Sequence, residues 1–123
     1  MRALALLFLL IAANEAKVFQ KCELASLMER NALGGFRGYS LGNWICMAYY
    51  ESGFNSRAVG PRNRDGSRDY GIFQINSRYW CDDNEGPTAN GCNSPCSAFI
   101  NDNITEDIAC AKRIVSDPQE MDA

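Results

Sequence analysis

The apolar residues of the chain recur at helical spacing in three segments, and the clearest of these follows Ser40. Ser40 is a suitable N-cap, because its hydroxyl can accept a hydrogen bond from the first turn of a helix. The apolar positions then fall at i, i+3, i+4 and i+7, and they are Leu41, Trp44, Ile45 and Ala48. This pattern predicts a helix with one buried face and with Glu51 near its end.

Two further helices are expected from the same kind of pattern. Residues 22–31 are good helix formers, and they are followed by Gly34 and Gly35, which can end a helix. Another helix can start with Thr105 as its N-cap and end before Pro118. The apolar face of that helix would consist of Ile108, Ala111, Ile114 and Val115.

Between residues 57 and 77 the helical spacing gives way to turn residues and a β-favouring run. The Asp65-Gly66 pair is a strong turn signal, so we expect a hairpin around it. Residues 81–96 show no period and are expected to form a loop. The order helix, helix, small sheet, loop and helix indicates an α+β fold, with residues 17–123 as a single domain.

Residues 1–16 have the features of a signal peptide. A basic start, Met1-Arg2, precedes the apolar run Ala3–Ala13. That run is shorter than the roughly 20 residues needed to cross a bilayer. We expect cleavage after Ala16, with a cut after Ala13 as the alternative. The protein is therefore expected to be secreted and to have no membrane span.

Composition narrows the possible chemistry. The chain has six cysteines, which in a small exported domain indicate disulfides. Its formal charge is −3 and it has no basic cluster, which argues against nucleic-acid binding. It also has no histidine, so proton transfer near neutral pH must fall to carboxylates, lysine, tyrosine or cysteine.

Two carboxylates and an aromatic pair form the strongest candidate site. Glu51 ends an apolar helix, where partial burial would favour its protonated form. Asp69 opens the β-favouring run beside Arg68, and it can serve as an anion facing positive charge. Tyr79-Trp80 offers flat rings on which sugars can stack. An acid, an anion and a stacking surface are what a glycosidase requires.

Seven blocks of sequence, taken together, resemble the c-type lysozymes of the lysozyme/α-lactalbumin superfamily. They are residues 17–19, 22–25, 38–44, 50–52, 65–77, 96–98 and 110–115. The resemblance implies a helical subdomain and a small antiparallel β-sheet subdomain with a cleft between them. It also implies a monomeric, antibacterial glycoside hydrolase that needs no cofactor. Its substrate would be peptidoglycan or chitooligosaccharide, cleaved by a retaining mechanism at β-1,4 bonds between N-acetylmuramic acid and N-acetylglucosamine.

The resemblance also assigns roles to individual residues. Glu51 would be the general acid and Asp69 the nucleophile or electrostatic stabiliser, a pair for which lysozymes are themselves the type case. The residues expected to bind substrate are Gln74, Asn76, Tyr79, Trp80 and Asp117. For Trp80 the alternative is packing against a disulfide at Cys81, and Trp44 is expected in the core.

The implied disulfides are Cys81–Cys96 and Cys92–Cys110. In the family, Cys22 and Cys46 pair with cysteines beyond the position of Ala123, and a tryptophan that packs against the acid follows that position too. The sequence therefore looks truncated at its C-terminus. Cys22 and Cys46 would be free, paired with each other, or partnered in a longer product. If the chain ends at Ala123, we expect weak folding and little activity, because two native bridges would be lost.

The segment before the last helix resembles the calcium loop of α-lactalbumin. The candidate ligands are Asn101, Glu106 and Asp107. Asn101 stands where the calcium binders have aspartate, so a solvated helix start is the alternative. The same segment contains a glycosylation sequon at Asn103.

Two other functions compete with a secreted muramidase. A catalytically silent carbohydrate-binding or regulatory protein of the α-lactalbumin type would have no need of both Glu51 and Asp69. A disulfide-stapled toxin or inhibitor would explain the cysteines but not the carboxylate pair. For the enzyme, the acidic net charge predicts weaker action on anionic cell walls than on soluble oligosaccharides.

Overall fold

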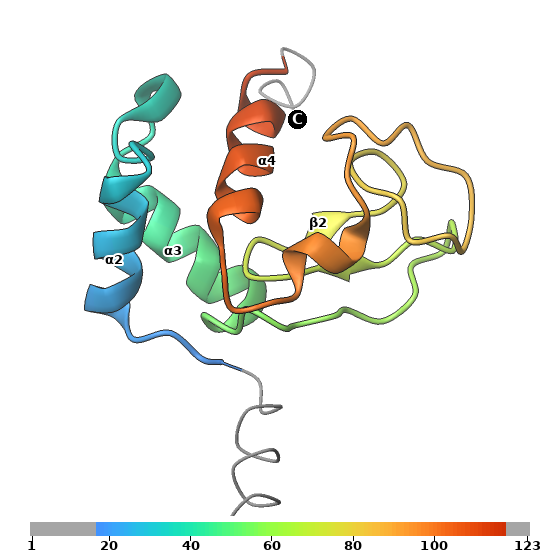
Figure 1. The fold of residues 1–123 in the computed structure, drawn as a ribbon, viewed down its shortest axis with the longest axis horizontal. Coiled ribbons are helices and arrows are strands. Elements are labelled where there is room, and N and C mark those ends of the chain that lie inside the picture. The colour runs from blue at the N-terminus through green and yellow to red at the C-terminus, as the bar shows by residue number, and fades with distance from the viewer. Residues whose placement is uncertain (1–16, 118–123) are drawn as a thin grey trace, which may run out of the picture.

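The computed structural model describes residues 17–117. Three helices, α2 (Lys21–Arg30), α3 (Leu41–Ser52) and α4 (Thr105–Val115), lie on one side of the molecule, and a short hairpin with long loops lies on the other (Figure 1). The hairpin strands are β1 (Asp69–Tyr70) and β2 (Ile75–Asn76), and short 3-10 turns occur at η1 (Phe36–Gly38) and η2 (Cys96–Phe99). The expected signal peptide and Pro118 lie outside the described residues.

Helix α3 forms as its sequence pattern predicts. Ser40 caps it, with Oγ accepting a hydrogen bond from Asn43 N at 3.1 Å, and Gly53 ends it at φ +62°. Trp44 and Ala48 are buried, and the Trp44 ring packs edge-on against Phe73 with centroids 6.0 Å apart. Because Phe73 belongs to the hairpin turn, Trp44 joins α3 to the β side of the molecule through the core.

Helices α2 and α4 differ slightly from expectation at their starts. Helix α2 begins at Lys21 and ends at Arg30, before the two glycines. Ala32 is already outside the helix, with a φ of +56°. Thr105 is the first residue of α4 and not its N-cap. Its N–H donates to Asn103 Oδ1 at 3.1 Å, so the capping oxygen comes from two residues upstream.

The hairpin expected around Asp65-Gly66 is present, although its arms pair only sparsely. Asn63 N donates to Ser67 O at 2.7 Å at the turn, and further along Gly60 N donates to Asp69 O at 2.9 Å and Gly71 N to Ala58 O at 2.7 Å, on either side of an antiparallel bridge between Val59 and Tyr70. The two named strands also pair with each other, Asp69 opposite Asn76 and Tyr70 opposite Ile75. The expectation did not include this second fold-back of the β-favouring run within residues 69–77.

The reason for the fold-back lies at Gly71, which has φ +81°. A Cβ at this position would stand 2.0 Å from the carbonyl oxygen of Phe99 and 2.6 Å from Asp107 Oδ2. Only glycine combines this backbone angle with so close an approach. The turn between β1 and β2 is therefore set by η2 and α4, which press against it.

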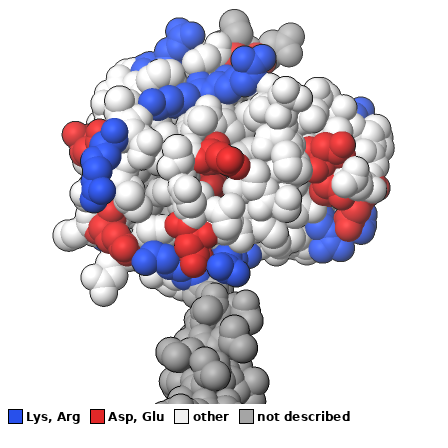
Figure 2. All heavy atoms as spheres, viewed as in Figure 1, with Lys and Arg blue, Asp and Glu red and all other residues white. Residues whose placement is uncertain are grey.

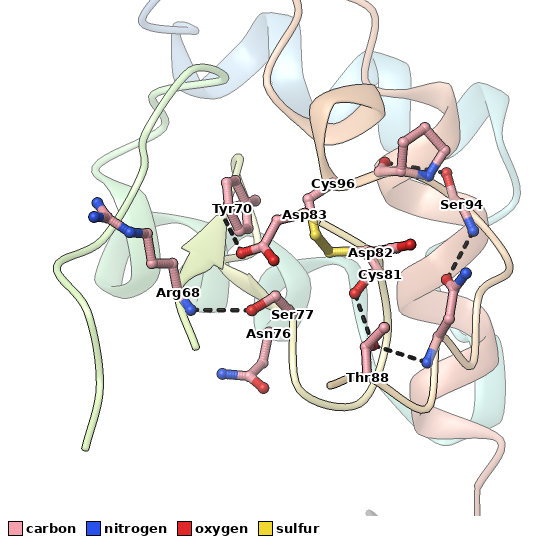
Figure 3. Close-up of a disulfide and its surroundings, with 12 residues drawn as sticks. Arg68, Tyr70, Asn76, Ser77, Cys81, Asp82, Asp83, Thr88, Ser94 and Cys96 are labelled. Carbon is pink, nitrogen blue, oxygen red and sulfur yellow. Dashed lines mark hydrogen bonds between the residues drawn. A yellow bond between two sulfur atoms is a disulfide. The ribbon is translucent and has the colours of Figure 1, made fainter. Parts of the chain in front are cut away.

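The long loop from Cys81 to Cys96 has no regular element, as expected, and it is held by polar contacts and a disulfide (Figure 3). Cys81 is bonded to Cys96 and Cys92 to Cys110, the two pairs implied by the family resemblance. Tyr70 donates from its hydroxyl to Asp83 Oδ2 at 2.8 Å, which ties the loop to β1.

Cys22 and Cys46 are free thiols and both are exposed. They are not paired with each other, which removes one of the three possibilities for them. Cys46 lies on the same stretch of α3 as Tyr49 and Tyr50, whose side chains are also exposed. This face of the helix pair is therefore the most apolar open surface among residues 17–117.

Candidate active-site cleft

A pocket of about 290 Å³ lies where α3, the β1–β2 hairpin and α4 meet. Its lining comes from all three: Trp44, Met47 and Glu51 from α3; Phe73, Gln74, Ile75 and Asn76 from the hairpin; Ala111, Ile114 and Val115 from α4, with Trp80 at one side. Most of these side chains are apolar. A carboxyl group in such a lining loses part of its hydration, which disfavours its charged form.

Glu51 stands in the last turn of α3 at the edge of this pocket. The neighbouring Ser52 hydroxyl donates to Ile72 O at 2.8 Å and so fixes the end of the helix against the hairpin turn. The pKa of Glu51 is raised, first by partial burial and second by the negative charge of Asp69. Glu51 is thus biased toward the protonated form, although its side chain is still exposed enough to reach a substrate.

Asp69 does not line this pocket but is held on β1 beside its lining residue Asn76. Its Oδ1 accepts a hydrogen bond from Asn76 Nδ2 at 2.9 Å, across the strand pair that aligns these two residues. Asn76 Nδ2 also donates to Ser67 Oγ at 3.0 Å. The carboxylate is therefore oriented by a polar network, in contrast to the apolar surroundings of Glu51.

Gln74 and Asn76 both line the pocket, but their amide groups are largely engaged within the protein. Gln74 Nε2 donates to the carbonyl oxygens of Gly71 and Ala58, at 3.0 and 3.2 Å. Asn76 Oδ1 accepts from Arg78 N at 2.8 Å. In this geometry both side chains support the hairpin that carries Asp69, which is a positioning role that the sequence alone did not suggest.

Trp80 extends the site toward a second pocket of about 510 Å³, which it shares with Asp117 and Phe36. The ring lies against Gly91, where a Cβ would come within 2.6 Å of it. Tyr79 borders neither pocket; its ring is about half exposed and lies 5.9 Å from the guanidinium of Arg78. Of the five expected substrate-binding residues, the structure brings Gln74, Asn76 and Trp80 to the first pocket and Asp117 to its neighbour.

Several lining residues were not anticipated as site residues. Met47, Phe73 and Ile75 form part of the lining, and Ile114 and Val115, expected only as the buried face of α4, reach it too. Their sequence signal was the helical or strand spacing of apolar residues. That spacing shows that a residue faces inward, but it does not show that the inward face borders a cleft.

The calcium site expected at Asn101, Glu106 and Asp107 is not confirmed. Within residues 17–117 no three carboxylate, cysteine or histidine side chains gather as a cation would require. The Oδ1 atom of Asn101 accepts a hydrogen bond from Asn103 N at 2.9 Å. Asp107 is fully buried, and burial raises its pKa to about 8.

Charges are mixed on the face shown in Figure 2, where acidic and basic side chains alternate along the edges of the molecule. The view shows no continuous basic surface. Among the described residues no helix is long and apolar enough to cross a membrane.

The sequence model of one protein family matches residues 17–123. The chain belongs to the C-type lysozyme/alpha-lactalbumin family. The dog protein "Lysozyme C, milk isozyme" is 57% identical over 107 residues, covering 87% of this chain and 83% of the relative. The rat protein "Putative lysozyme C-2" is 55% identical over 126 residues, covering 100% of this chain and 85% of the relative.

The fold agrees with solved lysozyme structures. The crystal structure of recombinant canine milk lysozyme in its apo form superposes with a TM-score of 0.82 at 57% identity, covering 86% of this chain and 82% of that one. Lysozyme from the donkey, Equus asinus, gives a TM-score of 0.81 at 55% identity, covering 86% of this chain and 82% of that one. The family resemblance and the α+β architecture inferred from the sequence are both confirmed.

Proposed function

We propose that this lysozyme-family protein is a muramidase that hydrolyses β-1,4 bonds between N-acetylmuramic acid and N-acetylglucosamine in peptidoglycan. Relatives at 55–57% identity carry the name lysozyme C. The observation that carries the proposal is the pair of unlike carboxyl environments, with Glu51 in the lining of the pocket and Asp69 held beside its lining residue Asn76. Glu51 has a raised pKa in an apolar lining, and Asp69 is close enough for its charge to contribute to that rise.

The first step would use Glu51 as a general acid. A saccharide lying between α3 and the hairpin would receive the Glu51 proton on its glycosidic oxygen as the C1–O bond breaks. Positive charge develops on the sugar ring at the same time. Asp69, oriented by Asn76, would face this charge and either stabilise it or form a bond to C1. Trp80 would offer its ring to an adjacent sugar.

The second step would return the enzyme to its starting state. Glu51, now a carboxylate, would take a proton from a water molecule as the water oxygen bonds to C1. If Asp69 had bonded to C1, that bond would break at the same time; if it had only stabilised the positive charge, that charge would disappear. The sugar keeps its anomeric configuration, because Asp69 occupies one face of C1 and the water adds from the face that the leaving sugar vacated. No group outside these two carboxyls has to accept a proton in this scheme.

We further propose that the protein is secreted and acts as a monomer. The features of residues 1–16 support export, and three of the similar relatives are named as milk isozymes. The alternative, a silent carbohydrate-binding or regulatory relative, is less well supported because both carboxylates are present and are set in different surroundings.

The test is hydrolysis of chitooligosaccharide and clearing of bacterial cell walls by the refolded chain. Glu51→Gln should lower the rate by about 10²–10⁴-fold, the usual contribution of a general acid. Glu29→Gln, which removes an exposed carboxylate from α2, should leave the rate unchanged. If Glu51→Gln matches the parent, the acid has been misassigned. If the folded parent binds the oligosaccharide but does not cleave it, the silent alternative holds.

A further inference from the structure

The turn that leads into α4 carries a feature unrelated to the cleft. Asn103-Ile104-Thr105 is the one Asn-x-Ser/Thr triplet in the chain with a residue other than proline in the middle. Asn103 and Thr105 are both exposed, whereas Ile104 between them is 3% exposed and anchored in the core. The triplet therefore presents its two recognition residues to solvent on a fixed turn.

The hydrogen bonds of Asn103 leave its amide nitrogen available. Its Oδ1 accepts from Thr105 N at 3.1 Å, and its backbone N–H donates to Asn101 Oδ1 at 2.9 Å. Asn103 Nδ2 donates no hydrogen bond to any residue from 17 to 117. A substituent on Nδ2 would consequently leave the oxygen that caps α4 in place.

The position of Asn103 also keeps a substituent away from the cleft. It precedes the N-terminal end of α4, while Ala111, Ile114 and Val115 contribute to the cleft from the second half of the helix (Figure 1). At 1.5 Å of rise per residue, Asn103 lies roughly 12 Å from Ala111 along the helix direction. A flexible glycan at this end would not have to occupy the pocket.

We propose that Asn103 is an N-glycosylation site, modified when the chain enters the secretory pathway. The bond formed joins Nδ2 to C1 of the first N-acetylglucosamine of a lipid-pyrophosphate-linked oligosaccharide. The bond broken joins that C1 to the pyrophosphate, which departs with the lipid, and Nδ2 loses one proton. The glycan adds a bulky, soluble group to a surface segment of a protein whose charge is small.

The test expresses residues 1–123 in mammalian cells and analyses the exported protein by mass spectrometry. Release of N-glycans in ¹⁸O-labelled water should leave a labelled aspartate at position 103. It should also make the protein migrate faster on a gel, by a single shift. Asn103→Gln and Thr105→Ala should abolish both signals, whereas Thr105→Ser, which keeps the triplet, should retain them. Asn101→Gln, two residues away, is the matched control and should stay glycosylated.

A second version carries residues 17–123 behind the leader of a known secreted protein, so that the result does not depend on residues 1–16. Glycan on this version but none on the first would count against export by the native leader and still support the site. Unmodified Asn103 in the exported second version, or a glycan that persists in Thr105→Ala, would overturn the proposal. Because attachment needs only an accessible triplet, a poorly folding variant still reports on it.

Discussion

The two sides of the cleft are stabilised in different ways. We call α2, α3 and α4 the helical region and residues 57–99 the loop region. In the helical region large apolar side chains such as Leu24, Met28 and Trp44 are almost completely buried. In the loop region short polar side chains bond to the backbone nearby: Asp65 Oδ1 accepts from Ser67 N and Asp82 Oδ1 from Asn84 N, both at 2.9 Å.

This difference explains how two chemically similar carboxyl groups can take opposite roles. Glu51 comes from the helical region and meets an apolar lining, which favours the neutral acid. Asp69 comes from the loop region and meets amide and hydroxyl groups that orient an anion. The cleft is the boundary between a region held by packing and a region held by hydrogen bonds and cross-links.

The largest expected effect comes from removing a cross-link from the loop region. The Cys81–Cys96 bridge closes a loop with a sequence separation of 15 residues. Replacing both cysteines by alanine should lower the free energy of unfolding by about 3 kcal/mol, because the unfolded chain regains the freedom of that loop. Denaturant unfolding curves measure the loss.

The matched control for that experiment lies in the helical region. Cys22→Ser combined with Cys46→Ser changes two exposed thiols and should alter the free energy of unfolding by less than about 0.5 kcal/mol. The two alanine substitutions at Cys81 and Cys96 are best made in a protein that already carries both serine substitutions, because free thiols could otherwise exchange with the remaining Cys92–Cys110 bridge. Equal losses from the two pairs would contradict the contrast between the regions.

Over a single pH unit, a smaller effect is expected from Asp107, which lies where α4 of the helical region meets the hairpin turn of the loop region. Neither carboxyl oxygen has a hydrogen-bond partner of good geometry among the described residues, and burial raises the pKa to about 8 from an ordinary 3.8. Between these two values the folded state holds a proton that the unfolded state releases. Stability should therefore fall as pH rises, by at most about 1.4 kcal/mol per pH unit.

Asp107→Asn should flatten this dependence, because asparagine is neutral throughout the range. The measurement is the slope of the unfolding free energy between about pH 5 and pH 7, which does not depend on the absolute cost of the substitution. Glu106→Gln, an exposed neighbour in the same turn of α4, should preserve most of the slope. A slope that survives Asp107→Asn would show that other groups cause it.

The helical region was largely predictable from the sequence, and the loop region was not. Ser40 and the apolar spacing after it are local signals, and they predicted α3 correctly. The hairpin around Asp65-Gly66 was predicted, but the second fold-back at Gly71 was not, because Gly71 is set by contact with Phe99, which is far along the chain. A strong local turn signal at Asp65-Gly66 could not reveal that contact.

The same limit applies to the candidate site. Glu51 and Asp69 were identifiable because the carboxylates fall in blocks that resemble a family, while their mutual proximity is a property of the fold. Ser52, which joins the end of α3 to Ile72, gave no signal beyond its place after Glu51. Contacts between the two regions, which decide the shape of the cleft, were thus the least predictable part.

The smallest expected effect is also the most direct probe of the contrast between the two walls of the cleft. Because Asp69 is the lesser of the two causes that raise the pKa of Glu51, Asp69→Asn should lower that pKa while leaving it above its ordinary value. Titration of the Glu51 carboxyl by NMR measures the change, with Asp65→Asn as a control from the same loop region. A fall to the ordinary value would mean that the charge of Asp69, and not the apolar lining from the helical region, raises the pKa of Glu51.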